Sequence, residues 1–125
     1  MVKSTEYVPQ RGDVVWINFN PQAGHEQGGY RPAVVLSPRV YNSKTRLAIL
    51  CPITKQVKGY PFEVAIPAGL DVTGVILTDQ VKSMDWRARN TALICSLPAQ
   101  IVEMVLQRVE TLLAREEGMG DKETT

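Results

Sequence analysis

Residues 12–38 read GDVVWINFNPQAGHEQGGYRPAVVLSP and hold two apolar runs on either side of a polar, glycine-rich loop. The first run, Val14 to Phe19, is rich in β-branched and aromatic side chains, and the second extends from Ala33 to Leu36. Runs of this length, bounded by Gly, Pro and Asn, are typical of strands. The stretch therefore predicts two strands joined by a long loop over residues 21–30, which has little to bury and should be mobile.

Short apolar runs bounded by Gly, Pro and Asn continue as far as Cys95. Leu47 to Ile53 is a further apolar run, and Phe62, Val64 and Ile66 alternate with polar or small residues, as on a half-buried strand. Val75 to Val81 and Ala92 to Cys95 complete about six short strands. This number and spacing of strands favour a small barrel or a sandwich.

After Cys95 the apolar residues recur with the period of an amphipathic helix. Ser96 is the candidate N-cap, Pro98 lies in the first turn, and Gly118 is expected to end the helix. The apolar stripe consists of Ile101, Val102, Val105, Leu106, Val109, Leu112 and Leu113. The predicted fold class is therefore mainly β with a C-terminal α-helix that packs on the sheet.

The length of 125 residues fits one domain, which we expect to span residues 1–117. Residues 118–125 contain almost nothing apolar and are predicted to form a disordered acidic tail. No apolar run approaches the roughly 20 residues that a membrane span needs. Residues 1–10 lack the apolar block of a secretion signal, so the cytoplasm is the expected compartment.

The charge is unevenly distributed, although the net charge is only +1. Residues 1–95 hold 11 Lys and Arg against 7 Asp and Glu, whereas residues 96–125 hold 3 against 6. A mildly basic β-rich part could attract phosphates, but such an excess is more often only a solvated surface.

The cysteines and the histidine offer little for metal chemistry. Cys51 and Cys95 each lie within apolar stretches, which favours two buried, inert thiols over a disulfide. A zinc site needs about four ligands, and one histidine with two scattered cysteines cannot easily supply them. We therefore expect no metal and no cofactor.

Two polar residues stand where a strand meets a loop. Arg31 precedes Pro32, which pushes it towards extended geometry at the start of a strand. Thr54 ends another strand, just after Pro52. A stiff strand fixes such a side chain while the loop admits substrate, although an arginine at a strand end is more often a surface charge. Spacing alone does not establish chemistry at these residues.

Other residues are open to two interpretations each. His25 or Glu26 could act as an acid or a base, but a lone loop histidine is more often simply exposed. Residues 86–89, Trp-Arg-Ala-Arg, would in a strand place the two arginines on one face and the tryptophan on the other. They could form a stacking and charged surface for single-stranded nucleic acid, or be a core tryptophan beside two solvated arginines; the two readings have equal weight. Gln80 and Lys82 would share a face and could donate to bases or phosphates.

Taken together, six segments resemble the MazF/PemK toxin family. They occur in the family's order and lie within residues 7 to about 113, and six in register are hard to obtain by chance. The segments are GDVVW (12–16), GHEQGGYRPAVVLSP (24–38), YNSKT (41–45), CPIT (51–54), KGYPFEV (58–64) and DQVKSMDWRAR (79–89).

The resemblance implies an SH3-like, strongly curved antiparallel barrel with a C-terminal helix, and a homodimer. It implies a toxin of a toxin–antitoxin module that cuts single-stranded mRNA sequence-selectively and without a metal, thereby arresting translation and growth. A cognate MazE-like antitoxin would block the toxin with an acidic segment laid across the RNA groove.

The family's catalytic arginine corresponds to Arg31, its threonine to Thr54, and the glutamate implicated in some members to Glu26. The position of His25 varies in the family, so no catalytic role carries over to it. Tyr30 replaces a histidine of some relatives, which puts histidine chemistry there in doubt.

The implied reaction is attack by the RNA 2′-hydroxyl, which leaves a 2′,3′-cyclic phosphate (or 3′-phosphate) and a 5′-hydroxyl. Arg31 would clamp the phosphate, Thr54 would donate a further hydrogen bond, and Glu26 is the candidate base, because an arginine pKa above about 12 makes its deprotonation costly. The residues expected to bind RNA are His25, Gln27, Lys55, Gln56, Lys58, Gln80, Lys82, Arg87 and Arg89.

Three other functions remain open at this point. A toxin of the same fold that poisons DNA gyrase, as CcdB-type proteins do, would have no active site. A plain nucleic-acid-binding barrel would protect RNA rather than cut it. A catalytically dead paralogue could serve only to titrate antitoxin, although all motif positions are intact.

Overall fold

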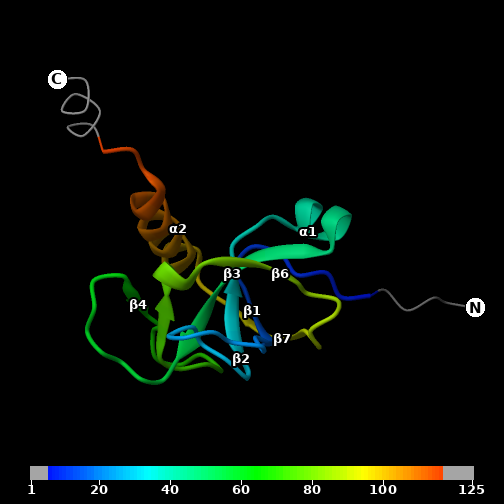
Figure 1. Ribbon diagram of the computed structural model, residues 1–125, viewed down its shortest axis with the longest axis horizontal. Coiled ribbons are helices and arrows are strands. Elements are labelled where there is room, and N and C mark those ends of the chain that lie inside the picture. Colours follow the sequence, from blue (N-terminus) through cyan, green and yellow to red (C-terminus); the bar gives the residue numbers. More distant parts are fainter. Residues whose placement is uncertain (1–5, 117–125) are drawn as a thin grey trace, which may run out of the picture.

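The computed structural model describes residues 6–116, which form one β-sheet, two α-helices and a short 3-10 turn (Figure 1). In chain order the elements are β1 (Asp13–Asn18), β2 (Tyr30–Val35), α1 (Arg39–Thr45), β3 (Leu47–Thr54), β4 (Glu63–Ala65), β5 (Val75–Leu77), the turn η1 (Thr78–Gln80), β6 (Lys82–Asp85), β7 (Ala92–Ser96) and α2 (Ala99–Leu113). The predicted fold class, mainly β with a C-terminal helix, is confirmed.

The seven strands pair antiparallel in the order β4-β5-β3-β2-β1-β7, and β6 also pairs with β3. β3 is the longest strand and the centre of the sheet, since one end of it pairs with β6 and the other with β5. Among the described residues β4 and β7 end the path without pairing to each other, so the sheet is open. The strongly curved closed barrel implied by the family resemblance is therefore not confirmed.

Strands β1, β2 and β3 form where apolar runs were predicted, but the expected strand from Val75 to Val81 is interrupted. The chain leaves the sheet at Thr78, whose buried hydroxyl donates to the Phe62 carbonyl over 2.6 Å, and it forms η1 before β6 begins. The prediction of one continuous strand was wrong at residues 78–80. β6 was not predicted.

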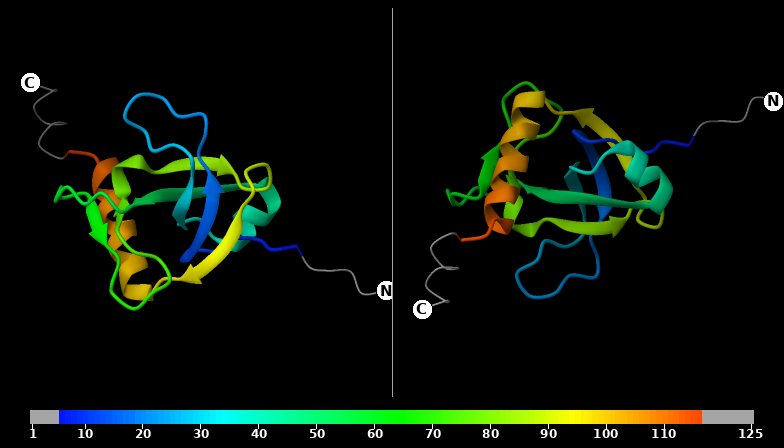
Figure 2. Two further views of the ribbon diagram at one scale, coloured as in Figure 1. Left: turned by 90° about the horizontal axis from the view of Figure 1, so that it is seen from below. Right: turned by 90° about the horizontal axis from the view of Figure 1, so that it is seen from above.

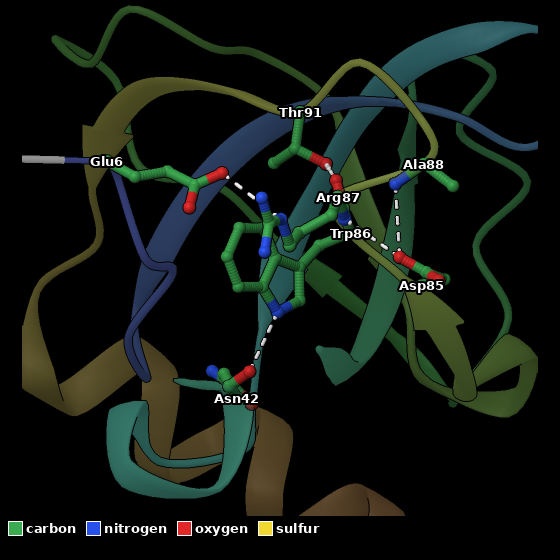
Figure 3. A network of polar contacts seen from close by, with 7 residues as sticks. All are labelled: Glu6, Asn42, Asp85, Trp86, Arg87, Ala88 and Thr91. Atoms are coloured by element: carbon green, nitrogen blue, oxygen red, sulfur yellow. Dashed lines mark hydrogen bonds and ion pairs between the residues drawn. The ribbon is translucent and has the colours of Figure 1, made fainter. Parts of the chain in front are cut away.

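α1 was not predicted either, because its seven residues are too few to show an apolar period. Tertiary contacts hold it in place: the fully buried Asn42 donates to the carbonyls of Pro9 and Ser37 over 2.8 and 3.1 Å. The indole N–H of Trp86 donates to the Asn42 carbonyl over 3.0 Å (Figure 3). Trp86 is only 5% exposed, so it is a core residue and offers no stacking surface.

Two apolar clusters lie on opposite faces of the sheet, as the alternation of β1 requires. Val14 belongs to the cluster that packs beneath α2, and Val15 to the cluster beside α1 and Trp86. Figure 2 shows α2 at the β4 side of the sheet, α1 at the opposite side, and the β1–β2 loop standing out from the body. Cys51 is fully buried and Cys95 partly so, and both thiols are free, as expected.

α2 begins after Pro98, and two of the predicted stripe residues, Val102 and Val105, are buried. Ser96 does not cap this helix: it ends β7, and its hydroxyl donates to the Asp13 carboxylate over 3.4 Å. The helix ends at Leu113, before the predicted Gly118, and Leu112 and Leu113 are exposed. The predicted tail, residues 118–125, lies outside the described residues. No described helix has the length and apolarity to cross a membrane.

Candidate active site

Arg31 and Thr54 line one cavity of about 670 Å³ where β2 begins and β3 ends. The two strands pair in a register that sets Ala33 opposite Pro52. The same register, continued by two residues, brings Arg31 level with Thr54 on the neighbouring strand. Residues at such positions share a face of a sheet, so strand pairing brings the two side chains to the same region.

The guanidinium of Arg31 is oriented by the loop before it. Its Nε donates to the Gly28 carbonyl over 2.7 Å, and its backbone pairs with Ile17 of β1. The terminal guanidinium nitrogens form no hydrogen bond to other residues within 6–116. They are available to a ligand, and their planar fork suits two oxygens of a phosphate.

Thr54 is 7% exposed, and its hydroxyl oxygen accepts the backbone N–H of Gln56 over 3.1 Å. This bond uses a lone pair of Oγ1, so the hydroxyl proton is free to be donated. The backbone of Thr54 pairs with Val75 of β5, next to Gly74. The strand pairing and the Gln56 contact together fix the direction of the hydroxyl.

Two further cavities adjoin the first. The second, of about 350 Å³, shares Gln27, Thr54 and Gln56 with it, and the third, of about 170 Å³, shares Gln27, Asp79 and Gln80 with the second. We call the three together the cavity row. They run from Arg31 and Thr54, past the β3–β4 loop, to the start of β6.

The cavity row brings together most of the residues predicted to bind RNA. Seven of the nine line it: His25, Gln27, Lys55, Gln56, Lys58, Gln80 and Lys82. They come from the β1–β2 loop, the β3–β4 loop and the segment around η1. Segments far apart in sequence therefore converge on the cavity row, and the first cavity of the row holds Arg31 and Thr54.

Arg87 and Arg89 do not line the cavity row. They lie in the turns after β6 rather than on a strand, so the predicted shared face does not exist. Arg87 forms an exposed ion pair with Glu6 over 3.2 Å (Figure 3), and Arg89 donates to the carbonyls of Asn18 and Asn20 over 2.9 and 2.8 Å. Both guanidinium groups therefore already have partners within the protein.

Glu26 is not brought together with Arg31 and Thr54. It lines the third cavity, and its carboxylate accepts the backbone N–H of Ala23 over 3.1 Å. The carboxylate that lines the first cavity is instead Asp71, from the segment between β4 and β5. Nothing in the sequence pattern singled out Asp71.

An aromatic pair also lines the first cavity and was missed. Trp16 and Tyr30 stack with their ring centroids 5.5 Å apart, and both rings are partly exposed. The Tyr30 hydroxyl donates to the Asn90 carbonyl over 2.9 Å, which holds the ring in place. The alternation of β1 puts Trp16 on the face away from Ile17, and the pairing of β1 with β2 sets Trp16 opposite Pro32, a neighbour that the sequence pattern did not indicate.

The second cavity carries two carboxylates. Glu63 accepts the backbone N–H groups of Lys58 and Gly59 over 3.2 and 3.0 Å, so it holds the β3–β4 loop. Burial raises the pKa of Asp79 above its ordinary value, and the charge of Glu63 adds to this shift. Within the described residues no group of three or more His, Cys, Asp or Glu is arranged to hold a metal ion.

Residues 10–113 match the family described as PemK-like, MazF-like toxin of type II toxin–antitoxin system. The chain is 44% identical over 109 residues to the endoribonuclease toxin MazF of Escherichia coli K12, an alignment that covers 87% of this chain and 97% of that protein.

Solved structures agree with this match. MazF from Deinococcus radiodurans superposes with a TM-score of 0.84 and 52% identity, covering 86% of this chain and 98% of that one. A chain of the MazE–MazF complex from the same organism gives a TM-score of 0.78 at 43% identity, covering 89% and 100%. The family match spans most of the chain and includes Arg31 and Thr54, and the chain therefore belongs to the PemK/MazF family of type II toxin–antitoxin toxins.

Proposed function

We propose that this protein is the toxin of a toxin–antitoxin module and acts as an endoribonuclease on single-stranded mRNA, which would arrest translation and growth. The activity named for its relatives supports this, since MazF and ChpB of Escherichia coli, at 44% and 36% identity, are both endoribonucleases. The observation that carries the proposal is the single cavity shared by Arg31 and Thr54.

The reaction proposed is transfer within the RNA itself. The 2′-oxygen attacks the adjacent phosphorus, the bond from phosphorus to the 5′-oxygen breaks, and the products are a 2′,3′-cyclic phosphate and a 5′-hydroxyl. One proton leaves the 2′-hydroxyl and one is added to the departing 5′-oxygen. No metal takes part in these steps.

Arg31 and Thr54 would stabilise the charge that gathers on the phosphoryl oxygens. The free end of the Arg31 guanidinium can bond two oxygens at once, and the Thr54 hydroxyl can donate to one. Donors held in place before the reaction are worth about 3–4 kcal/mol each in a transition state. Arg31 would also donate a hydrogen bond to the departing 5′-oxygen and so stabilise the charge that develops there, while water supplies the proton.

Glu26 is the proposed base for the 2′-hydroxyl because of the family resemblance, although it lines the third cavity and not the cavity of Arg31 and Thr54; among residues 6–116 its carboxylate accepts only the Ala23 N–H. Asp71 is the second candidate, because it lines the same cavity as Arg31 and Thr54. Glu26→Gln and Asp71→Asn distinguish the two. The base is the residue whose amide variant removes the acidic limb of the pH–rate profile.

RNA would lie along the cavity row and contact the predicted residues that line it, His25, Gln27, Lys55, Gln56, Lys58, Gln80 and Lys82. Arg87 and Arg89 do not line the row and would contact RNA outside it. Splayed bases in such a groove allow sequence readout, and the cationic contacts predict that binding weakens with salt. We further propose a homodimer in the cytoplasm, with a MazE-like antitoxin as partner. The superposition on a chain of a MazE–MazF complex supports this partner.

The proposal is tested by incubating the purified protein with a long RNA and mapping the new 5′ ends. A short RNA that contains one mapped site is then compared with the same strand carrying a single 2′-deoxy nucleotide at the cut. We expect cleavage of the first only, unchanged by EDTA. Cleavage of the 2′-deoxy strand would refute the 2′-hydroxyl mechanism, and intact RNA throughout would favour a gyrase poison or a plain RNA-binding protein.

A further inference from the structure

Gln80 connects two parts of the cavity row that are remote in sequence. Its side-chain oxygen, Oε1, accepts the backbone N–H of Gln27 over 2.9 Å, across 53 residues of chain. The contact is partly buried, and both residues line the second and third cavities. The sequence pattern had suggested only that Gln80 donates to RNA.

On one side of this contact lies a firmly held element. Gln80 is the last residue of η1, and Thr78 in the same turn is fully buried and donates to the Phe62 carbonyl through both its hydroxyl and its backbone N–H. η1 directly follows β5, which pairs with β3 so that Val75 lies opposite Thr54. Gln80 therefore belongs to the same packed unit as Thr54.

On the other side lies the loop that orients Arg31. Gln27 is followed by Gly28, whose carbonyl accepts the Arg31 Nε–H over 2.7 Å. The loop has no strand or helix of its own between residues 19 and 29. One hydrogen bond from Gln80 thus joins the Thr54 unit to the backbone that directs the Arg31 guanidinium.

We propose that Gln80 is a positioning residue: it holds the β1–β2 loop so that Gly28 aims Arg31 at the phosphate beside Thr54. This inference rests on the proposed function. It replaces the RNA contact proposed above for Gln80 with a role as an acceptor towards Gln27, so that the Gln80 side chain holds the loop instead of donating to a base. Gln80 would act through the loop that orients Arg31, and neither Gln80 nor Gln27 needs to touch the reacting atoms.

The size of the effect follows from how steeply catalysis depends on geometry. A displacement of about 1 Å at a reacting group can reduce the rate by about 100-fold. The loop is also held at its ends, where Phe19 N–H donates to the Gly29 carbonyl and Gly29 N–H to the Asn20 side chain. We therefore expect a partial loss, of about ten-fold in kcat, when only the Gln80 contact is removed.

Two substitutions separate the positioning role from RNA contact. Gln80→Met keeps the length of the side chain but removes the acceptor, whereas Gln80→Glu keeps the acceptor and removes the donor. We expect Gln80→Met to lower kcat about ten-fold with KM changed less than about two-fold. Gln80→Glu should restore kcat to within about three-fold of wild type, and its added negative charge should raise KM. Gln107→Met, on the exposed face of α2, controls for the exchange of amide for thioether.

Hydrogen exchange of the Gln27 backbone amide gives a readout that does not depend on activity. The amide should be protected in wild type, Gln80→Glu and Gln107→Met, and should exchange faster in Gln80→Met. Equal loss of kcat in Gln80→Met and Gln80→Glu, full kcat in Gln80→Met, or unchanged exchange at Gln27 would each overturn the inference. A wild-type chain that cuts no RNA would refute the proposed function instead, and the exchange rates would still decide whether Gln80 holds the loop.

Discussion

Gly74 lies so close to Thr54 that a β-carbon at Gly74 would stand 2.2 Å from the Thr54 carbonyl oxygen. The backbone of Gly74 also has a φ of +118°, a conformation that L residues with a side chain rarely adopt. The chain entering β5 can therefore approach the end of β3 only because residue 74 has no side chain. The position of Thr54 in the candidate site depends on this approach.

Gly74→Ala should displace the end of β3 and reduce both stability and RNA cleavage. Gly69→Ala is the matched control, because Gly69 has a similar φ of +93° but open space where a β-carbon would stand. We expect the control to lose about 1–2 kcal/mol of unfolding free energy from backbone strain alone. Gly74→Ala should lose about 1–3 kcal/mol more, from the clash. Urea unfolding measures both, and equal losses in the two variants would contradict the account.

Asn42→Ala should strongly destabilise the fold. The buried side chain joins α1 to Pro9 and Ser37, and its removal leaves the groups that it satisfied without partners in the core. Each such buried group costs about 1–3 kcal/mol, so we expect a loss of about 3 kcal/mol in unfolding free energy. Ser43→Ala, on the exposed side of the same helix, should change stability by less than about 0.5 kcal/mol. Similar values for the two variants would show that the Asn42 contacts contribute little.

Stability should decrease as the pH rises above about 9. Burial, with a smaller contribution from the charge of Asp79, raises the pKa of the Cys51 thiol from 9.0 to about 12. Burial and the hydrogen bond to Asp13 likewise raise the pKa of Tyr7 above its ordinary 10.0. Both groups ionise first in the unfolded chain, so a higher pH favours unfolding. Urea titrations from pH 7 to 10.5 measure the slope, which should be shallower in Cys51→Ala; an identical slope would exclude Cys51 as a cause.

Arg31→Lys should lose at least about 100-fold in kcat although the charge is kept. A lysine ammonium has no planar fork, and it cannot both donate to the Gly28 carbonyl and bond two phosphoryl oxygens in the same arrangement. Arg39→Lys, at the exposed start of α1, is the control and should retain full activity. Single-turnover cleavage of one short RNA is sufficient to compare the two variants. Near-normal activity of Arg31→Lys would show that Arg31 contributes only its positive charge and not its planar fork.

The sequence predicted those parts of the fold that depend on local apolar pattern. β1, β2 and β3 carry long runs of buried side chains, and Val102 and Val105 mark the buried stripe of α2. α1 could not be predicted, because its seven residues are held by Asn42 contacts with distant segments. The interruption at Thr78 depends in the same way on the Phe62 carbonyl, a tertiary partner.

The residues of the candidate site divide in the same way, into those that the local sequence pattern indicates and those that depend on tertiary contacts. Arg31 lies at the start of a strand and Thr54 ends one, each beside a polar loop, but their roles were implied only by the family resemblance; the structure brings both residues to one cavity. Asp71 and the Gln80 contact could not be predicted, since both depend on how loops fold over the sheet. Arg87 and Arg89 would share a face only if residues 86–89 formed a strand, whereas Asp85 accepts the backbone N–H groups of Arg87 and Ala88 and directs the chain out of the sheet.

The central claim is that Arg31 and Thr54 act on one phosphodiester as a unit. Its most direct test is a double-mutant cycle of Arg31→Ala and Thr54→Ala, measured by single-turnover cleavage of an RNA with one mapped site. Residues that act together give non-additive losses, so the double variant should be no more than about ten-fold slower than the worse single variant. If the two single losses multiply in full in the double variant, or if either single variant cuts at the wild-type rate, the two residues do not form one site.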